Sequence, residues 1–150
     1  YDGLQPVFET PGAEPHTDPG VYEGGILVVT GVANPSGLLT YAEGLSGKVE
    51  HLRFPDHYRY RSKDVSNIYQ SWKRMGAPEK KILVLTTEKD ASKIRELDLP
   101  EELRPALSAV RIRVTFLNND QENFEKQILS YVTSNKRSSI LHQEEDSLQP

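Results

Sequence analysis

Four strand-like apolar runs, each followed by a helix-like pattern, constrain the fold of this chain more than any other feature. The first run, residues 26–32, is rich in β-branched and aliphatic residues, which is typical of a strand buried on both faces. The other runs cover residues 49–54, 82–86 and 110–116. This alternation favours parallel pairing with right-handed crossovers. We therefore predict an α/β fold, a three-layer Rossmann-like domain with a mainly parallel four-stranded sheet and helices on both faces. Numbering the runs along the chain, we expect the strand order 2-1-3-4.

Helix start signals lie between the apolar runs. Asn34 as cap and Pro35 at the first helical position predict a helix after the first run. Ser62 is the expected cap of the second helix, and Thr87 with Asp90 resembles a capping box before the third. The second helix carries one apolar face at the spacing i, i+3, i+4, i+7, made by Val65, Ile68, Tyr69 and Trp72.

The composition divides the chain into three parts. Residues 1–24 form a Pro/Gly-rich linker, in which residues 4–8 are a candidate edge strand. Residues 25–133 form the α/β domain, and residues 134–150 are expected to be a flexible polar tail. The last helix, at about residues 120–132, is expected to bury the apolar side chains Phe124, Ile128, Tyr131 and Val132.

Charge and residue usage exclude several classes of function. The net charge of −4 disfavours a general nucleic-acid binder, and so we expect no nucleic-acid partner. There is no cysteine, and the four histidines lack ligand spacing, so no metal site is predicted. The longest apolar runs are far shorter than the about 20 residues of a membrane span.

Three polar segments follow the first three strands, and parallel strands bring such segments to one edge of a sheet. The first, residues 31–37, reads GVANPSG and lacks the Lys-Ser/Thr of a P-loop. It is a tight turn with a capped helix, and its free amides, beside Asn34, could also face an anion. In the segment that follows the third strand, residues 86–90, Thr87 and Asp90 are explained as caps. Lys89 opposes the helix dipole, and a phosphate held between it and Lys93 would relieve that mismatch.

The polar segment after the second strand, residues 55–61, places an acid and a histidine among cations. Asp56 and His57 are adjacent, and Arg59 and Arg61 follow. One interpretation is an ordinary loop with an exposed histidine. The other is a site in which His57 moves protons near neutral pH and the arginines hold phosphate oxygens. Stacking of bases on Tyr58 is disfavoured by the net charge.

Together these segments resemble the carboxy-terminal lobe of the tetraacyldisaccharide 4'-kinase family of Gram-negative bacteria. The order and spacing agree over about residues 25–133. The family motifs and their positions here are Gly-x-x-Asn-Pro at Gly31, Asn34 and Pro35; Phe-Pro-Asp-His with following aromatics at Phe54, Pro55, Asp56, His57, Tyr58 and Tyr60; and Thr-Thr-Glu-Lys-Asp-Ala at Thr86, Thr87, Glu88, Lys89, Asp90 and Ala91.

The resemblance implies an ATP-dependent lipid kinase that phosphorylates the 4'-hydroxyl of tetraacyldisaccharide 1-phosphate in lipid A biosynthesis. The reaction would take place at the cytoplasmic face of the inner membrane, to which the whole protein would attach peripherally. In the family, ATP and Mg²⁺ are bound mainly by an amino-terminal P-loop lobe, which also carries a catalytic aspartate that a histidine of this lobe faces. His57 matches that histidine, and Asp56 would orient it. Residues 1–24 would then join the two lobes.

The partners implied are the P-loop lobe, ATP, the lipid A precursor and, through the whole protein, the membrane surface. The candidates for substrate or phosphate binding are Arg59, Arg61, Tyr58, Lys89, Thr87 and Asn34. We expect this chain by itself to be inactive, because phosphoryl transfer depends on the P-loop and its metal. The alternative function is a non-catalytic Rossmann-like module that binds a phosphorylated small ligand or a protein.

Overall fold

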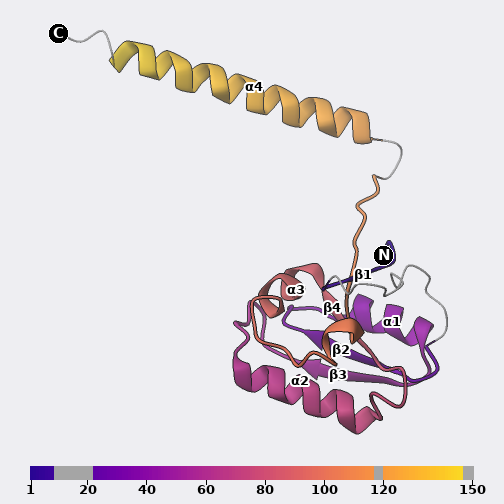
Figure 1. The fold of residues 1–150 in the computed structure, drawn as a ribbon. Helices are drawn as coiled ribbons and strands as arrows, with labels where there is room; N and C mark the ends of the chain where they lie inside the picture. Colours follow the sequence, from indigo (N-terminus) through magenta and orange to yellow (C-terminus); the bar gives the residue numbers. More distant parts are fainter. Residues whose placement is uncertain (9–21, 117–119, 147–150) are drawn as a thin grey trace. The chain divides into compact units, whose positions relative to one another are not determined.

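The computed structural model describes residues 1–8, 22–116 and 120–146, and it divides into two compact units (Figure 1). The first unit is Tyr1–Arg113 and the second is Val114–Pro150. Most of the predicted Pro/Gly-rich linker, residues 9–21, lies outside the described residues. The predicted site residues all belong to the first unit.

The first unit is built on one five-stranded sheet. Its strands are β1 (Leu4–Pro6), β2 (Ile26–Thr30), β3 (Val49–Arg53), β4 (Leu83–Thr87) and β5 (Leu107–Val110). They lie in the order β1-β5-β4-β2-β3, and every pair is parallel except β1 with β5. The α/β class and the mainly parallel sheet are therefore confirmed.

The predicted count of four strands is wrong, and the full strand order differs from the prediction because a fifth strand, β1, is added at the edge beside β5. The four parallel strands lie in the order β3-β2-β4-β5, which matches the predicted 2-1-3-4. β1 pairs antiparallel with β5, with Leu4 opposite Val110, so the short edge strand expected near residues 4–8 belongs to the sheet. The last parallel strand also lies earlier than predicted. It ends at Val110, and the residues after it, 111–116, form no strand, with Ile112 and Val114 exposed.

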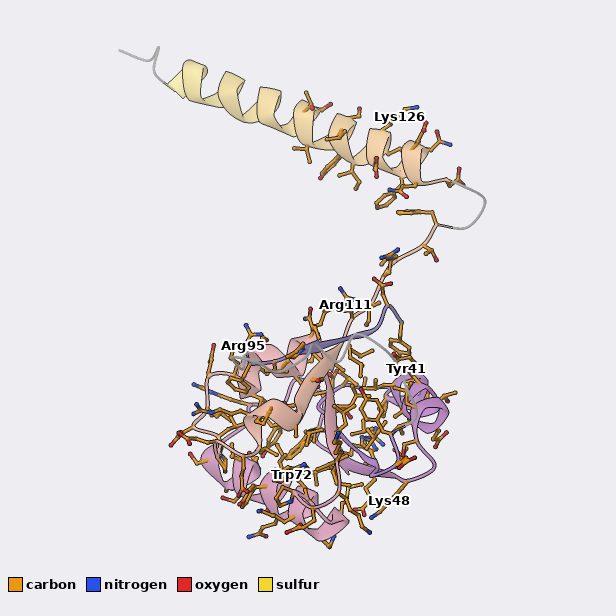
Figure 2. All side chains as sticks on the ribbon, turned by 45° about the vertical axis from the view of Figure 1, so that its right-hand side comes forward. Tyr41, Lys48, Trp72, Arg95, Arg111 and Lys126 are labelled. Atoms are coloured by element: carbon orange, nitrogen blue, oxygen red, sulfur yellow. The ribbon has the colours of Figure 1, made fainter. Side chains whose placement is uncertain are left out.

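Helices pack on both faces of the sheet, as predicted. They are α1 (Ser36–Leu45), α2 (Ser62–Met75) and α3 (Glu88–Ile94), with a 3-10 turn η1 (Arg104–Ala106) before β5. Apolar side chains of α1 join one core cluster with Val28 and Leu85, whereas those of α2 and α3 join the other with Val29 and Val84. Figure 2 shows Trp72 of α2 among the side chains of this second core, where its indole donates to the carbonyl of Ile82 at 3.0 Å.

The helix starts agree with the predicted caps at one position of three. Thr87 is the N-cap of α3 and accepts from the amide of Asp90 at 3.1 Å. α1 begins one residue later than predicted, with Pro35 at the cap position. α2 has Arg61 at its cap position, one residue before the expected Ser62, and the carboxylate of Asp64 in the first turn accepts from the Arg61 amide at 2.9 Å.

Among the described residues of the second unit there is one helix, α4 (Gln121–Asp146). The sequence predicts a helix with buried apolar side chains here, but Phe124, Ile128, Tyr131 and Val132 are all at least 46% exposed. In the described part of this unit no sheet is present for that face to cover, although Phe116 stacks on Phe124 with ring centroids 5.0 Å apart. α4 also continues into residues 134–150, where the sequence predicts a polar tail. None of the helices in the described ranges combines the length and the apolarity that crossing a bilayer requires.

Leu85→Ala in the central strand β4 should lower the free energy of unfolding by about 2–5 kcal/mol, because it leaves a cavity in a closed core. Leu85 is fully buried, whereas Ile112 is 63% exposed and provides a matched control. Urea unfolding of the two variants measures the difference. A loss from Leu85→Ala no larger than that from Ile112→Ala would contradict the observed core.

Candidate functional site

Three polar segments meet at one edge of the sheet, beyond the carboxyl ends of β2, β3 and β4. The parallel register places Thr30 at the end of β2 beside Arg53 at the end of β3. The amide of Phe54 donates to the carbonyl of Thr30 at 2.7 Å, and the amide of Gly31 donates to Asp90 in α3 at 2.8 Å. The structure thus joins the segments that sequence reasoning assigned to one site.

His57 lies at the exposed tip of the segment after β3. Its side chain is 79% exposed. Its backbone has a φ of 56°, in the left-handed region that residues other than glycine rarely adopt. Asp56 accepts from the His57 amide at 2.9 Å, and its other oxygen lies 3.7 Å from the ring nitrogen Nε2. The predicted acid–histidine pair therefore exists, with the imidazole turned toward solvent.

Asp56 also pairs with Lys89, which lies in α3 after strand β4. The Lys89 ammonium lies 3.5 Å from Asp56 Oδ1. Desolvation works to raise the pKa of the Asp56 carboxyl, but the hydrogen bond from the His57 amide and the charges of His57 and Lys89 together lower it below its ordinary value. The carboxylate is thus ionised at neutral pH, and it compensates the unfavourable position of Lys89 at a helix start.

The other predicted phosphate ligands of this segment divide into exposed and inward-facing groups. Arg59 and Arg61 are exposed, and neither makes an ion pair with any residue that the structure describes. Tyr58 instead packs on Phe54 with centroids 5.0 Å apart, and its hydroxyl lies 3.4 Å from Asp64. The two arginines are available to a ligand, whereas the Tyr58 ring is occupied in the scaffold.

The turn after β2 is closed by its own side chains. Asn34 Oδ1 accepts from both the amide and the hydroxyl of Ser36, at 3.1 and 2.7 Å. Its carbonyl oxygen is therefore engaged locally, as a helix-start residue would be. A Cβ at Gly31 would lie 3.1 Å from Asp90 Oδ1 and 3.3 Å from the carbonyl of Pro55, so glycine allows these segments to approach closely.

Two residues of α3 have roles that sequence reasoning did not assign. Asp90 is fully buried and accepts from the Thr87 hydroxyl at 3.0 Å as well as from Gly31. Lys93 donates to the carbonyl of Tyr58 at 3.0 Å and lies 3.8 Å from Asp90. Lys89 and Lys93 thus have separate protein partners. The only sequence signal for Asp90 was the Thr-x-x-Asp spacing of an ordinary cap.

The described residues do not by themselves suit a magnesium ion. They include no group of three or more histidine, aspartate or glutamate side chains placed to hold a metal. The cations at this edge, Lys89, Arg59 and Arg61, suit anionic oxygen atoms instead. The arrangement therefore offers positive charge at the same edge of the sheet as the exposed His57 imidazole.

Comparison with known proteins reveals similarity over most of the chain. The profile of the family described as Tetraacyldisaccharide-1-P 4'-kinase matches residues 7–133. The chain is 34% identical over 158 residues to a tetraacyldisaccharide 4'-kinase of Bacteroides thetaiotaomicron, which covers 99% of the chain and 40% of that relative. A kinase of the same name from Phocaeicola vulgatus is 35% identical over 115 residues, covering 76% of the chain and 31% of the relative.

A third relative, the tetraacyldisaccharide 4'-kinase of Bacteroides fragilis, is 32% identical over 123 residues, which are 81% of the chain and 32% of the relative. The chain thus spans less than half the length of the curated relatives it matches. No solved structure gives a significant match.

Removing the Lys89 charge should raise the pKa of Asp56. We expect a titration of Asp56 followed by NMR to give a pKa below the ordinary 3.8, and Lys89→Met to move it upward because an adjacent cation is lost. Lys80→Met is the matched control, since that lysine is exposed and lies before β4, at the opposite ends of the strands. An equal response to both substitutions would contradict the Asp56–Lys89 pair.

The backbone of His57 makes a second prediction. A left-handed conformation costs an L-residue about 1–2 kcal/mol. Glycine avoids this cost, but it loses more conformational entropy on folding, which offsets part of its advantage. His57→Gly should therefore be more stable than His57→Ala by about 0.5–1 kcal/mol, although both remove the imidazole. Urea unfolding compares them, and equal stability would argue against the left-handed conformation.

Proposed function

Since the chain belongs to the tetraacyldisaccharide 4'-kinase family, we propose that it is the carboxy-terminal lobe of a lipid kinase. The whole enzyme transfers the γ-phosphate of ATP to the 4'-hydroxyl of tetraacyldisaccharide 1-phosphate in lipid A biosynthesis, at the cytoplasmic face of the inner membrane. The observation that carries this proposal is the convergence of the three family motifs at one sheet edge, where they place His57 at the exposed tip.

In this proposal the amino-terminal P-loop lobe binds ATP with Mg²⁺, and it faces this sheet edge. Phosphoryl transfer depends mainly on positioning and on stabilising charge around the phosphate. This chain supplies both in part: His57 reaches toward the acceptor hydroxyl and a carboxylate of the other lobe, and the exposed Arg59 and Arg61 face phosphate oxygens.

Asp56 and Lys89 support His57. The Asp56 carboxylate bonds the His57 amide and lies beside its Nε2, so it fixes the loop and the orientation of the ring. Lys89 holds Asp56 in turn and adds positive charge beside the phosphate. A neutral imidazole has one nitrogen free to accept a proton, which suits it to assist deprotonation of the 4'-hydroxyl.

In the enzyme that carries both lobes, His57→Ala should lower kcat about 100-fold, as expected when a group that assists proton transfer is lost. Arg95→Gln, an exposed change past the last turn of α3, is the control and should leave kcat unchanged. The assay is ATP-dependent 4'-phosphorylation of the tetraacyldisaccharide.

The same assay on residues 1–150 alone should give no phosphorylation, because the P-loop lobe is needed. Full activity of His57→Ala would remove His57 from the mechanism. Binding of a phosphorylated small molecule without any kinase activity in the two-lobed protein would favour the non-catalytic module instead.

A further inference from the structure

The carboxylate of Asp90 is the most deeply buried charge at the functional edge. Its side chain is fully buried, whereas the Asp56 carboxylate is 39% exposed. Removing a carboxylate from water is costly unless hydrogen bonds and nearby positive charge compensate it. Asp90 receives hydrogen bonds from Gly31 and Thr87, and the Lys93 ammonium lies 3.8 Å from its other oxygen.

These contacts join three segments that are far apart in the sequence. Gly31 follows β2, and Thr87 ends β4. Lys93 extends the link to the segment after β3, residues 55–61, because it donates to the carbonyl of Tyr58 at 3.0 Å, one residue after His57. A buried charge, one lysine and one backbone carbonyl therefore connect the centre of the sheet to the loop that carries the histidine.

Tyr60 approaches the same point from the histidine loop. Its hydroxyl and Asp90 Oδ1 are both buried, and neither has a hydrogen-bond partner of normal geometry among the described residues. A Cβ at Gly31 would lie 3.2 Å from the Tyr60 hydroxyl and 3.1 Å from Asp90 Oδ1, so the two oxygens flank one small space. Burial first, and then the charge of Asp90, raise the pKa of Tyr60, so the hydroxyl keeps its proton and can offer it to the carboxylate.

Capping alone does not account for this burial. Thr87 already caps α3 through its hydroxyl, and an exposed residue at the Asp90 position would leave that cap in place. The desolvated charge is explained if it has a further task, which is to hold the chain segments around it in one arrangement.

We propose that Asp90 is a positioning residue that fixes the His57 loop through Lys93 and through the Gly31 turn. It touches no substrate, and it acts by tying the end of β2, the start of α3 and the backbone beside His57 into one network. The inference rests on the proposed function only in giving His57 a catalytic role. The network itself is a property of the described residues.

The test is amide hydrogen exchange of residues 1–150, which reports local opening residue by residue. In Asp90→Asn, a hydrogen bond to a charged group is weakened, so the exchange rates of the Gly31 and Tyr58 amides should rise. The rise should be about tenfold larger than the rise at the amide of the central Leu85, which reports the change in global stability. Trp72→Phe is the matched control. It removes a buried hydrogen bond to Ile82, just before β4 and away from the functional edge, and should affect Gly31, Tyr58 and Leu85 alike.

A second variant keeps the proposal testable if Asp90→Asn unfolds. Lys93→Met removes the link to the loop and the positive charge beside Asp90 Oδ1, but it keeps the hydrogen bond from Gly31 to Oδ2, so it should speed exchange at Tyr58 more than at Gly31. The proposal is overturned if Tyr58 exchange in both variants follows only the global stability, as in Trp72→Phe. Kinase activity plays no part in this measurement, so its outcome is independent of whether the proposed function holds.

A catalytic readout separates positioning from simple stability. In the two-lobed enzyme, Lys93→Met should lower kcat about tenfold with the KM values for ATP and lipid unchanged, since misplacing a catalytic group affects the reaction step. Lys93→Arg restores a cation with donors and should recover part of kcat. An unchanged kcat in Lys93→Met, in an enzyme that His57→Ala inactivates, would refute the positioning role while leaving the kinase function intact.

Discussion

The parallel pairing of β2 with both of its neighbours is the constraint on which the rest of the first unit depends. β2 is buried on both faces and lies between β3 and β4 in the sheet. Its register sets the ends of all three strands at one edge, so three polar segments from distant parts of the chain must meet there. Hydrophobic burial of the strand core thus determines where the polar chemistry lies, at a driving force of roughly 25 cal/mol per Å².

Pairing alone does not orient the segments that follow the strands, and the buried Asp90 contributes this second level of order. A loop with an exposed tip has few apolar contacts to fix it. Here the rings of Phe54, Tyr58 and Tyr60 pack on one another within the segment after β3. Lys93 donates a hydrogen bond to the backbone of the same segment. The result is an exposed imidazole on a loop whose base is packed against the scaffold, which is the usual construction of a functional loop.

The sequence predicts these features unevenly, for physical reasons. Long aliphatic runs identify β2 and β4 because both faces of those strands are buried. β5 is short and contains Ser108 and Ala109, so the stronger alternation of residues 111–116 drew the prediction past it. The helical period of α4 is readable, but burial of its apolar face depends on a partner surface that periodicity does not reveal. Likewise, the spacing of Thr87 and Asp90 reveals a cap, whereas the burial of Asp90 arises only in the tertiary structure.

The contrast between a buried network and exposed charges bears on how such a lobe would work. His57, Arg59 and Arg61 are open to solvent, where water weakens their electrostatic interactions with any phosphate. Under the proposed function, a second lobe that closes on this edge excludes water and strengthens those interactions at the moment of transfer. That gain requires the groups to be in place beforehand, because a loop that must first be ordered spends part of the closing energy on its own entropy. The links from the buried Asp90 and the half-buried Lys93 meet this requirement inside the lobe, which leaves the binding energy of closure for the transition state.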